Sequence, residues 1–309
     1  MAGFTASRAY YGKIMLFGEY SVMEGSSAVL IPYPKVQATL CLPGSCKPYP
    51  LALESNRSIQ AFAGYLTELW HLKDIAVPFD LTRFTNDVKE GLYLQSSIPE
   101  NYGLGSSGAL CAALFDTYSI PENPEKTFPV QDLQTIFSLM ESFFHGSSSG
   151  ADPLCIYLNE PLVIHHGNYL LPGHAGMQAR NETEFFLIDS GRKSHTGPHV
   201  QYFRNKMGDE GYRMDFIQKY IPLVNLAVEQ WIDGALKEST VLDLSVAQLI
   251  FFQPMIPDSL REVWEKGIET GLYGLKLCGS GGGGMVLCYT RDVQATRVFL
   301  RKRYGIELT

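Results

Sequence analysis

The chain has 309 residues, of which 45% are hydrophobic and 18% charged, and a formal net charge of −7. This composition indicates a globular protein with a large core and excludes disorder as the dominant state. The negative charge argues against a nucleic-acid partner, which usually needs a basic face. No apolar run reaches the roughly 18 residues of a membrane span, and the N-terminal residues lack the apolar core of a signal peptide, so we expect no membrane partner and a cytoplasmic location.

The first half of the chain predicts strands followed by helices. Apolar or alternating residues favour strands over 13–17, 28–31 and 36–42. Apolar side chains recur at helical spacing over 56–72, 109–118 and 130–144, which favours helices.

Beyond Asp152 the pattern changes. Segments 153–157, 162–165 and 184–189 are expected to be extended, and helices are expected over 197–208, 212–238 and 258–272. A strand pair should flank residues 279–284, and a helix over 292–304 should close the chain. Turn-rich residues between 165 and 180 predict a boundary, so we expect two domains, 1–170 and 171–309.

The six cysteines are predicted to be free thiols. They are Cys41, Cys46, Cys111, Cys155, Cys278 and Cys288. No Cys-x-x-Cys pair occurs among them, which argues against zinc or thioredoxin-like chemistry. We therefore expect them to pack mostly as small hydrophobic side chains.

The 29 glycines cluster, and the central cluster is Pro99-Glu-Asn-Tyr-Gly-Leu-Gly-Ser-Ser-Gly108. It runs into the predicted helix that follows, and a helix N-terminus with converging backbone N–H groups suits a phosphate. Ser106 and Ser107 add hydroxyls that can contact phosphate or magnesium. The alternative is a plain glycine turn with an N-cap, and no P-loop motif of the G-x-x-x-x-G-K-[ST] type occurs.

A second cluster runs from Glu141 to Asp152 through a serine-rich loop that contains Gly146 and Gly150. Glu141 lies on or beside the apolar face of its predicted helix, where an ionised group is costly unless it is paired or bound to metal. The two glycines end that helix, so the loop can fold back and bring both carboxylates toward one site. The alternative is a structural pair of Glu141 with a lysine and a turn or N-cap role for Asp152, and His145 is expected to orient the loop.

A third cluster, Gly279 to Gly284, lies between two predicted strands. A dinucleotide fingerprint needs a helix after the glycines, which disfavours a nicotinamide-dependent oxidoreductase. The loop should instead pack its backbone closely against a ligand or another glycine loop. Lys13, at the start of a buried strand, calls for an anionic partner, whereas a solvated loop is the simpler interpretation for Arg192 and Lys193.

Together and in this order, the three segments resemble the motifs of the GHMP kinase superfamily, and most of all those of the mevalonate kinases. The resemblance rests on Lys13, on Pro99 to Gly108, on His145 to Asp152, and on Lys276 to Gly284. It implies an α/β (α+β) GHMP kinase fold, with an N-terminal domain similar to ribosomal protein S5 domain 2 and a ferredoxin-like C-terminal domain. One departure is Phe17-Gly-Glu-Tyr20, where mevalonate kinases usually carry His-Gly-Glu-His, and the segment from Glu19 to Gly25 more closely resembles phosphomevalonate kinases.

The resemblance also implies roles for individual residues, with ATP and Mg²⁺ as cofactors. Catalytic roles fall to Asp152, Lys13 and Thr196, and magnesium ligands are Ser107 and Glu141. The residues implied in nucleotide binding are Pro99, Gly103, Leu104, Gly105, Ser106, Ser107, Gly108, Gly281 and Gly282. Glu19, Tyr20 and Arg192 are implied to contact the substrate.

The implied activity is phosphorylation of the primary hydroxyl of mevalonate by ATP, in isoprenoid precursor synthesis. The partner would be a small molecule, and the chain would act as a monomer or homodimer. Phosphomevalonate kinase or another small-molecule GHMP kinase is the nearest alternative. A homologue that senses ATP or a metabolite without catalysis is an alternative of another class.

Overall fold

The computed structural model describes residues 6–72, 75, 77–120, 128–165, 168–170, 184–194 and 196–308, without the side chains of Leu170, Glu184 and Thr196. The chain forms two compact units, each assembled from separate stretches of sequence. Unit 1 takes Met1–Lys13, Pro32–Pro99 and Leu104–Glu160, and unit 2 takes Ile14–Ile31, Glu100–Gly103 and Pro161–Thr309. The predicted division at residue 170 stays a prediction, and most of the turn-rich segment that suggested it lies outside the described residues.

Two strands contribute to both units. They are β1 (Tyr10–Phe17) and β2 (Ala28–Cys41). The first part of β2 pairs antiparallel with β4, and its last part pairs antiparallel with β3. Pro32 and Pro34 lie between these two paired segments, where a missing N–H removes no bond to β3 or β4. The separate strands predicted over 28–31 and 36–42 are therefore one continuous strand.

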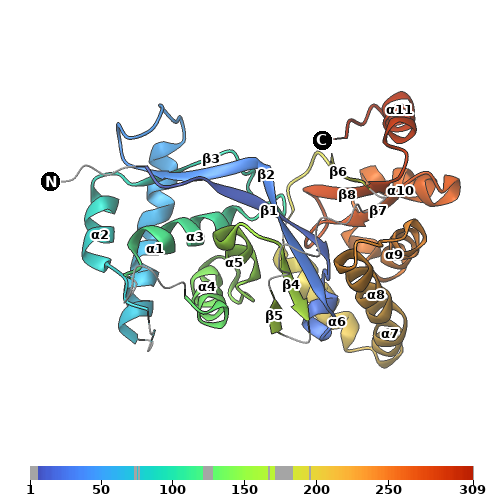
Figure 1. Cartoon of the computed structure of the whole chain (residues 1–309), viewed down its shortest axis with the longest axis horizontal. Helices are drawn as coiled ribbons and strands as arrows, with labels where there is room; N and C mark the ends of the chain where they lie inside the picture. The colour runs from blue at the N-terminus through green and yellow to red at the C-terminus, as the bar shows by residue number, and fades with distance from the viewer. Residues whose placement is uncertain are drawn as a thin grey trace. The chain divides into compact units, whose positions relative to one another are not determined.

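Helices dominate unit 1 (Figure 1). Its other elements are α1 (Ala52–Leu72), α2 (Leu81–Lys89), β3 (Tyr93–Ser96), α3 (Ser106–Tyr118), α4 (Val130–His145) and α5 (Ala151–Leu158). The almost uncharged α3 is buried along most of its length, because α4 and α5 both pack against it. Residues 153–157 were expected to be extended and this was wrong: they form part of α5, whose first turn accepts Pro153 without loss of a helical hydrogen bond.

Unit 2 contains a three-stranded antiparallel sheet in the order β6-β8-β7, with α9 and α10 packed on β7. Its strands are β4 (Leu162–His165), β5 (Asn168–Leu170), β6 (Glu184–Asp189), β7 (Gly274–Leu277) and β8 (Met285–Thr290). Its α-helices are α6 (Thr196–Met207), α7 (Glu210–Asp215), α8 (Ile221–Ile232), α9 (Glu238–Phe251), α10 (Asp258–Thr270) and α11 (Val293–Tyr304). Short helical turns cover Ser21–Glu24, Phe216–Tyr220 and Gln253–Met255.

The predicted helix over 212–238 was too long, and α9 was not predicted. Asp233 and Gly234 end α8, with Gly234 at a positive φ of 67°, and a new helix begins at Glu238. The short α2 and β3 were also absent from the prediction. Among the described residues, no helix has the length and apolar character needed to span a membrane.

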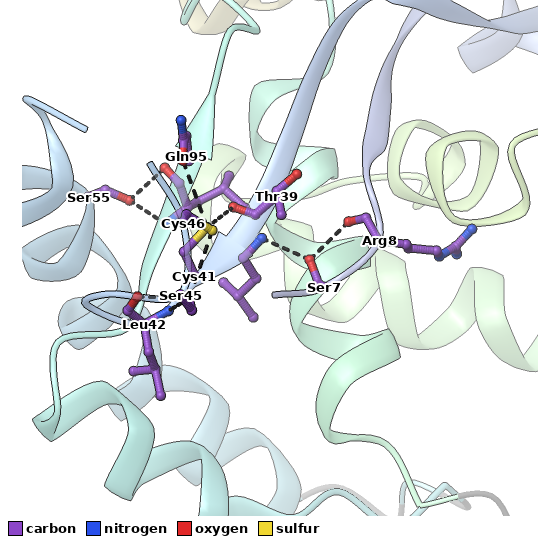
Figure 2. Close-up of a disulfide and its surroundings, with 11 residues drawn as sticks. Ser7, Arg8, Thr39, Cys41, Leu42, Ser45, Cys46, Ser55 and Gln95 are labelled. Atoms are coloured by element: carbon purple, nitrogen blue, oxygen red, sulfur yellow. Dashed lines mark hydrogen bonds between the residues drawn. A yellow bond between two sulfur atoms is a disulfide. The ribbon is translucent and has the colours of Figure 1, made fainter. Parts of the chain in front are cut away.

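Cys41 and Cys46 form a disulfide, so the prediction that all six cysteines are free thiols was wrong for this pair (Figure 2). The turn between them explains the pairing. Leu42, Pro43, Gly44 and Ser45 form a tight turn in which the Ser45 N–H donates to the Leu42 carbonyl at 3.0 Å, with Gly44 at φ +86°. A Pro-Gly pair favours this turn type, and the turn places the flanking cysteines face to face. The other four cysteines are free and buried, as predicted.

We predict that reduction of this disulfide lowers the free energy of unfolding by about 2 kcal/mol, because a closed loop of this size restricts the unfolded chain by that amount. Urea unfolding with and without a dithiol reductant measures the loss. A Cys46→Ser variant should unfold identically in both conditions. Thiol titration of the unreduced, unfolded protein should find the four free cysteines; a count of six would contradict the disulfide.

Candidate functional site

Helix α3 begins with an N-terminus that no side chain caps. Its N-cap is Gly105, which has φ +83° and no side chain that could accept from the first-turn N–H groups. These N–H groups have no partner within the helix, and the helix dipole adds partial positive charge beside them. The start of α3 is therefore suited to bind an anion such as a phosphate.

Close packing at two glycines brings other elements to this helix end. A Cβ on Gly105 would lie 3.0 Å from Lys13 Cγ and 2.9 Å from Ile156 Cδ1. A Cβ on Gly108 would lie 3.0 Å from the backbone nitrogen of Pro153. Only glycine permits both approaches without displacement, so the first turn of α3 lies directly against β1 and the first turn of α5.

Lys13 and Asp152 form an ion pair beside this helix end. Lys13 Nζ lies 2.7 Å from Asp152 Oδ2, with the lysine side chain 4% and the aspartate side chain 29% exposed. The Lys13 N–H also donates to the Leu104 carbonyl at 3.0 Å, which ties β1 to the residues before α3. A lysine this deeply buried needs an anionic partner, and the partly exposed carboxylate leaves the pair accessible from one side.

Glu141 lies in the same cluster and is 3% exposed. The Ser107 hydroxyl donates to Glu141 Oε1 at 3.2 Å, and the Ser148 hydroxyl donates to Oε2 at 2.5 Å. Burial raises the pKa of Glu141 to about 7, the negative charge of Asp152 adds to this rise, and the two hydroxyls and Lys13 oppose it. The structure thus brings together Lys13, Ser107, Glu141 and Asp152.

The serine-rich loop folds back along α4, which explains why these groups meet. Gly150 has φ +75°, and a Cβ there would lie 2.4 Å from the Gln134 carbonyl oxygen. The Ser138 hydroxyl of α4 donates to the Ser148 carbonyl at 2.6 Å. The loop therefore packs along the side of α4. This places the Ser148 hydroxyl at Glu141 and the first residues of α5 beside the site.

One residue of this cluster was missed in the sequence: Ser148 was not identified as a partner of Glu141, although its place in the serine run is a usable signal. The Nε2 atom of His145 lies 3.2 Å from the Ser107 hydroxyl, a contact that the sequence did not indicate, and the expectation that His145 orients the serine loop stays a prediction. Burial lowers the pKa of His145, an effect that the nearby Asp152 opposes and the charge of Lys13 adds to.

Oxygen ligands at the start of α3 are of the kind that Mg²⁺ prefers, since the Ser107 hydroxyl and the Glu141 carboxylate are both hard donors. Within the described ranges, no group of three or more His, Cys, Asp or Glu side chains could hold a metal by itself. These two residues fit Mg²⁺ in the way it binds beside nucleotides, with most of its ligands supplied by phosphate oxygens and water.

The third glycine cluster belongs to unit 2 and packs against Tyr102 and Gly103, which are part of the central cluster. A Cβ on Gly284 would lie 2.8 Å from Tyr102 Cα, and a Cβ on Gly103 would lie 2.5 Å from the Cys278 carbonyl oxygen. The sequence predicted that this loop packs against a ligand or against another glycine loop, and the structure shows a contact with another glycine loop. Gly282 also packs on the ring of His199, a contact that the sequence did not indicate.

Four other predicted site residues belong to unit 2. Glu19 is buried in an ion pair with Lys276, and the Tyr20 hydroxyl donates to the Ser280 carbonyl at 2.5 Å. The Arg192 side chain is exposed, while its carbonyl accepts from the Gly284 N–H at 2.6 Å. The side chain of Thr196, which begins α6, lies outside the described residues.

Residues 69–160 match the family model for the GHMP kinases N terminal domain. This segment contains α3, α4, α5 and the whole cluster around Glu141 apart from Lys13. Among curated protein sequences, none matches the chain significantly.

Solved structures of small-molecule kinases share the fold. L. major mevalonate kinase in complex with R-mevalonate is 17% identical over 99% of this chain and 95% of that one, with a TM-score of 0.64. A Lactococcus lactis galactokinase is 14% identical over 97% and 91% of the two chains (TM-score 0.66), and a Streptococcus pneumoniae phosphomevalonate kinase is 16% identical over 99% and 98% (TM-score 0.63). The chain therefore has the α/β GHMP kinase fold, and the predicted resemblance to the GHMP kinase superfamily and its mevalonate kinases is confirmed.

The raised pKa of Glu141 predicts an unusual pH dependence for the free energy of unfolding of the protein, measured with a metal chelator in the buffer so that no metal binds Glu141. Between pH 4.5 and about 7 the folded state binds more protons than the unfolded state, so the free energy of unfolding falls as the pH rises through this window. The contribution is on the order of 3 kcal/mol.

Glu141→Gln should remove this fall, as measured by urea unfolding from pH 4.5 to 7. The exposed Glu54→Gln of α1 is the matched control and should keep the wild-type slope. If the free energy of unfolding changed with pH in the same way in wild type and in Glu141→Gln, the pKa of Glu141 would not be raised and the prediction would be wrong.

Proposed function

We propose that this protein is an ATP- and Mg²⁺-dependent kinase that phosphorylates the primary hydroxyl of mevalonate, giving 5-phosphomevalonate and ADP. The observation that carries the proposal is the cluster of Lys13, Ser107, Glu141 and Asp152 at the uncapped start of α3. The GHMP kinase fold supports phosphoryl transfer in general. The mevalonate kinases among the structural neighbours support this acceptor in particular.

The triphosphate would bind at the first turn of α3, where the backbone N–H groups of Ser106 to Gly108 meet the dipole of the helix. Ser107 and Glu141 would hold Mg²⁺, which supplies neutralisation of the charge that develops on the phosphate oxygens. Lys13 and a bound Mg²⁺ would both favour the ionised form of Glu141, because a nearby positive charge lowers the pKa of a carboxyl group.

Lys13 and Asp152 would act on the acceptor. Asp152 is partly exposed, so its carboxylate can accept a hydrogen bond from the acceptor hydroxyl and orient its oxygen toward the γ-phosphorus. As the new O–P bond forms and the bond to ADP breaks, the hydroxyl proton passes to the carboxylate. Lys13 holds the carboxylate in place and offsets negative charge around the transferred group.

A polar hollow in unit 1 is the place we propose for the nucleoside. It has a volume of about 700 Å³ and is lined by residues that include Lys47, Tyr49 and Gln95 to Ser97. Ser97 is separated from Pro99, the start of the proposed phosphate-binding segment, only by Ile98. Tyr49 offers an aromatic face and the serines and glutamine offer hydrogen bonds, which is the mixture that a purine ribonucleoside requires.

Phosphomevalonate kinase is the second candidate, because the segment from Glu19 to Gly25 more closely resembles those enzymes and because one of them is among the structural neighbours. A homologue that binds ATP without catalysis is less well supported, since it would have no use for a buried lysine paired with a partly exposed aspartate. The cytoplasmic location, the place in isoprenoid precursor synthesis and the monomeric or homodimeric state remain predictions.

The acceptor is tested by a coupled assay of ADP release with mevalonate, phosphomevalonate, homoserine and galactose. We expect kcat/KM for mevalonate to exceed the others by about 100-fold or more, which is the discrimination that matched polar contacts provide. Activity should require Mg²⁺. Turnover of phosphomevalonate alone would establish the second candidate, and no turnover of mevalonate would refute the first.

Replacement of the carboxylate tests its role directly. Asp152→Asn should lower kcat by about 10²–10⁴-fold, since it removes the proton acceptor and the charge that Lys13 balances. Asp116→Asn is the matched control, because Asp116 forms an ion pair with Arg8 at 2.9 Å elsewhere in unit 1 and should leave kcat near wild type. Unchanged transfer by Asp152→Asn would refute the role proposed for Asp152, whereas a wild-type protein that binds ATP but transfers no phosphate would favour the non-catalytic homologue.

A further inference from the structure

A second buried ion pair lies in unit 2, outside the cluster described above. Lys276 of β7 donates to Glu19, which follows β1, and each side chain is 1% exposed. Lys276 Nζ also donates to the Leu277 carbonyl at 2.8 Å and lies 5.9 Å from the centre of the Phe17 ring. The pair thus joins the residues after β1 to the strand that leads into the glycine loop 279–284.

Further buried hydrogen bonds continue from this pair. The Leu277 N–H donates to Gln248 Oε1 at 2.8 Å, and Gln248 Nε2 donates to the Tyr220 hydroxyl at 2.9 Å. Burial raises the pKa of Tyr220, and the charge of Glu19 raises it further. The end of β7, immediately before the glycine loop, is therefore held by a connected polar network with no access to solvent.

Tyr20 connects Glu19 to the glycine loop itself. Its φ of 61° is uncommon for a residue with a side chain, and it directs a buried ring between Phe203 and Phe252, with both ring centres 5.0 Å away. The hydroxyl donates to the Ser280 carbonyl at 2.5 Å. Burial and then the charge of Glu19 raise the pKa of Tyr20, so the hydroxyl remains protonated and remains a donor.

The glycine loop has little freedom to adjust to a displaced Ser280. Gly282 N–H donates to the Met255 carbonyl, and the Ser194 hydroxyl donates to the Gly281 carbonyl, both at 2.5 Å. The backbones of Gly281 and Gly284 are too close to Met255 and Tyr102 to admit a Cβ. A shift of Tyr20 would move Ser280, and because the loop cannot adjust around it, the other residues of the loop would move as well.

A buried ion pair is a poor means of stabilising a fold, because desolvation of the two charges offsets their attraction, and well-packed apolar residues often do as well. It is a good means of imposing one geometry, because each charge is satisfied only with its partner in place. The Lys276–Glu19 pair is therefore better suited to positioning than to stability.

We propose that Lys276 and Glu19 are positioning residues that fix the glycine loop 279–284 through Tyr20, and that Glu19 and Tyr20 do not contact the acceptor. The catalytic part of this inference rests on the proposed kinase function. The loop is the segment that the family resemblance places at the phosphate site, so a loosened loop would lower the fraction of molecules in reactive geometry.

The test compares Glu19→Leu/Lys276→Met, Lys276→Met and Tyr20→Phe with wild type. Hydrogen exchange of the Gly281 to Gly284 amides measures the order of the loop without any substrate. Thermal unfolding measures stability, and the ADP-release assay with mevalonate gives kcat and KM. Lys266→Met/Glu269→Gln removes a solvent-accessible ion pair of α10, in which Lys266 is partly and Glu269 largely exposed, and is the matched control.

We expect Lys276→Met to be strongly destabilised, because it removes the positive charge that faces the buried Glu19 carboxylate, and the double variant to regain most of the lost stability. The double variant should nonetheless exchange its loop amides about 10-fold faster. Its kcat should fall about 10-fold, whereas KM for mevalonate should change by less than about threefold. Tyr20→Phe, which removes a single hydroxyl, should shift exchange and kcat in the same direction with wild-type stability.

Wild-type exchange and kcat in Tyr20→Phe and in the folded double variant would overturn the proposal. A large rise in KM for mevalonate with unchanged exchange would also overturn it, since Glu19 or Tyr20 would then bind the acceptor directly. If the wild type phosphorylates no acceptor, the proposed function fails, and loop exchange alone decides whether the pair positions the loop. The control should match wild type in every measurement.

Discussion

The candidate site depends on the close approach of the backbone at the start of α3. Gly105 and Gly108 allow β1 and the first turn of α5 to lie against this helix end, at distances that a Cβ would prevent. Without that approach, Lys13 and Asp152 would not reach the first turn of α3, and the N–H groups there would face no organised set of charges. Fixing the serine loop along α4 completes the arrangement, because it supplies Ser148 to Glu141.

Buried charge is the second constraint, and the two units meet it differently. In unit 1 the Asp152 side chain of the Lys13–Asp152 pair is 29% exposed, so a ligand can reach the carboxylate and form a hydrogen bond with it. In unit 2 both members of the Lys276–Glu19 pair are 1% exposed, and no ligand can reach them without disruption of the core. Similar pairs thus suit opposite purposes, a reactive site in the first case and a fixed geometry in the second.

Much of this could be predicted from the sequence where the signal is local. Helical periodicity located α1, α3 and α4, and glycine placement located the loops that require close backbone contact. The errors have physical causes. The segment 153–157 is apolar and short, so its periodicity does not separate a strand from a buried helix. The Cys41–Cys46 disulfide depends on a Pro-Gly turn between the cysteines, which a search by cysteine spacing alone overlooks. Partners distant in sequence, such as Lys276 and Glu19, carry no local signal at all.

The replacement of histidine by tyrosine at position 20 has a different meaning once its contacts are known. As a sequence difference it points to another acceptor, because the family resemblance implies that Tyr20 contacts the substrate. In the structure the Tyr20 hydroxyl is engaged by the Ser280 carbonyl and its ring is buried between two phenylalanines. The single proton of the hydroxyl is thus donated within the protein and is not available to donate to mevalonate or phosphomevalonate. The tyrosine is therefore weak support for a phosphorylated acceptor, and the positioning role that we propose for Tyr20 leaves recognition of the acceptor to other residues.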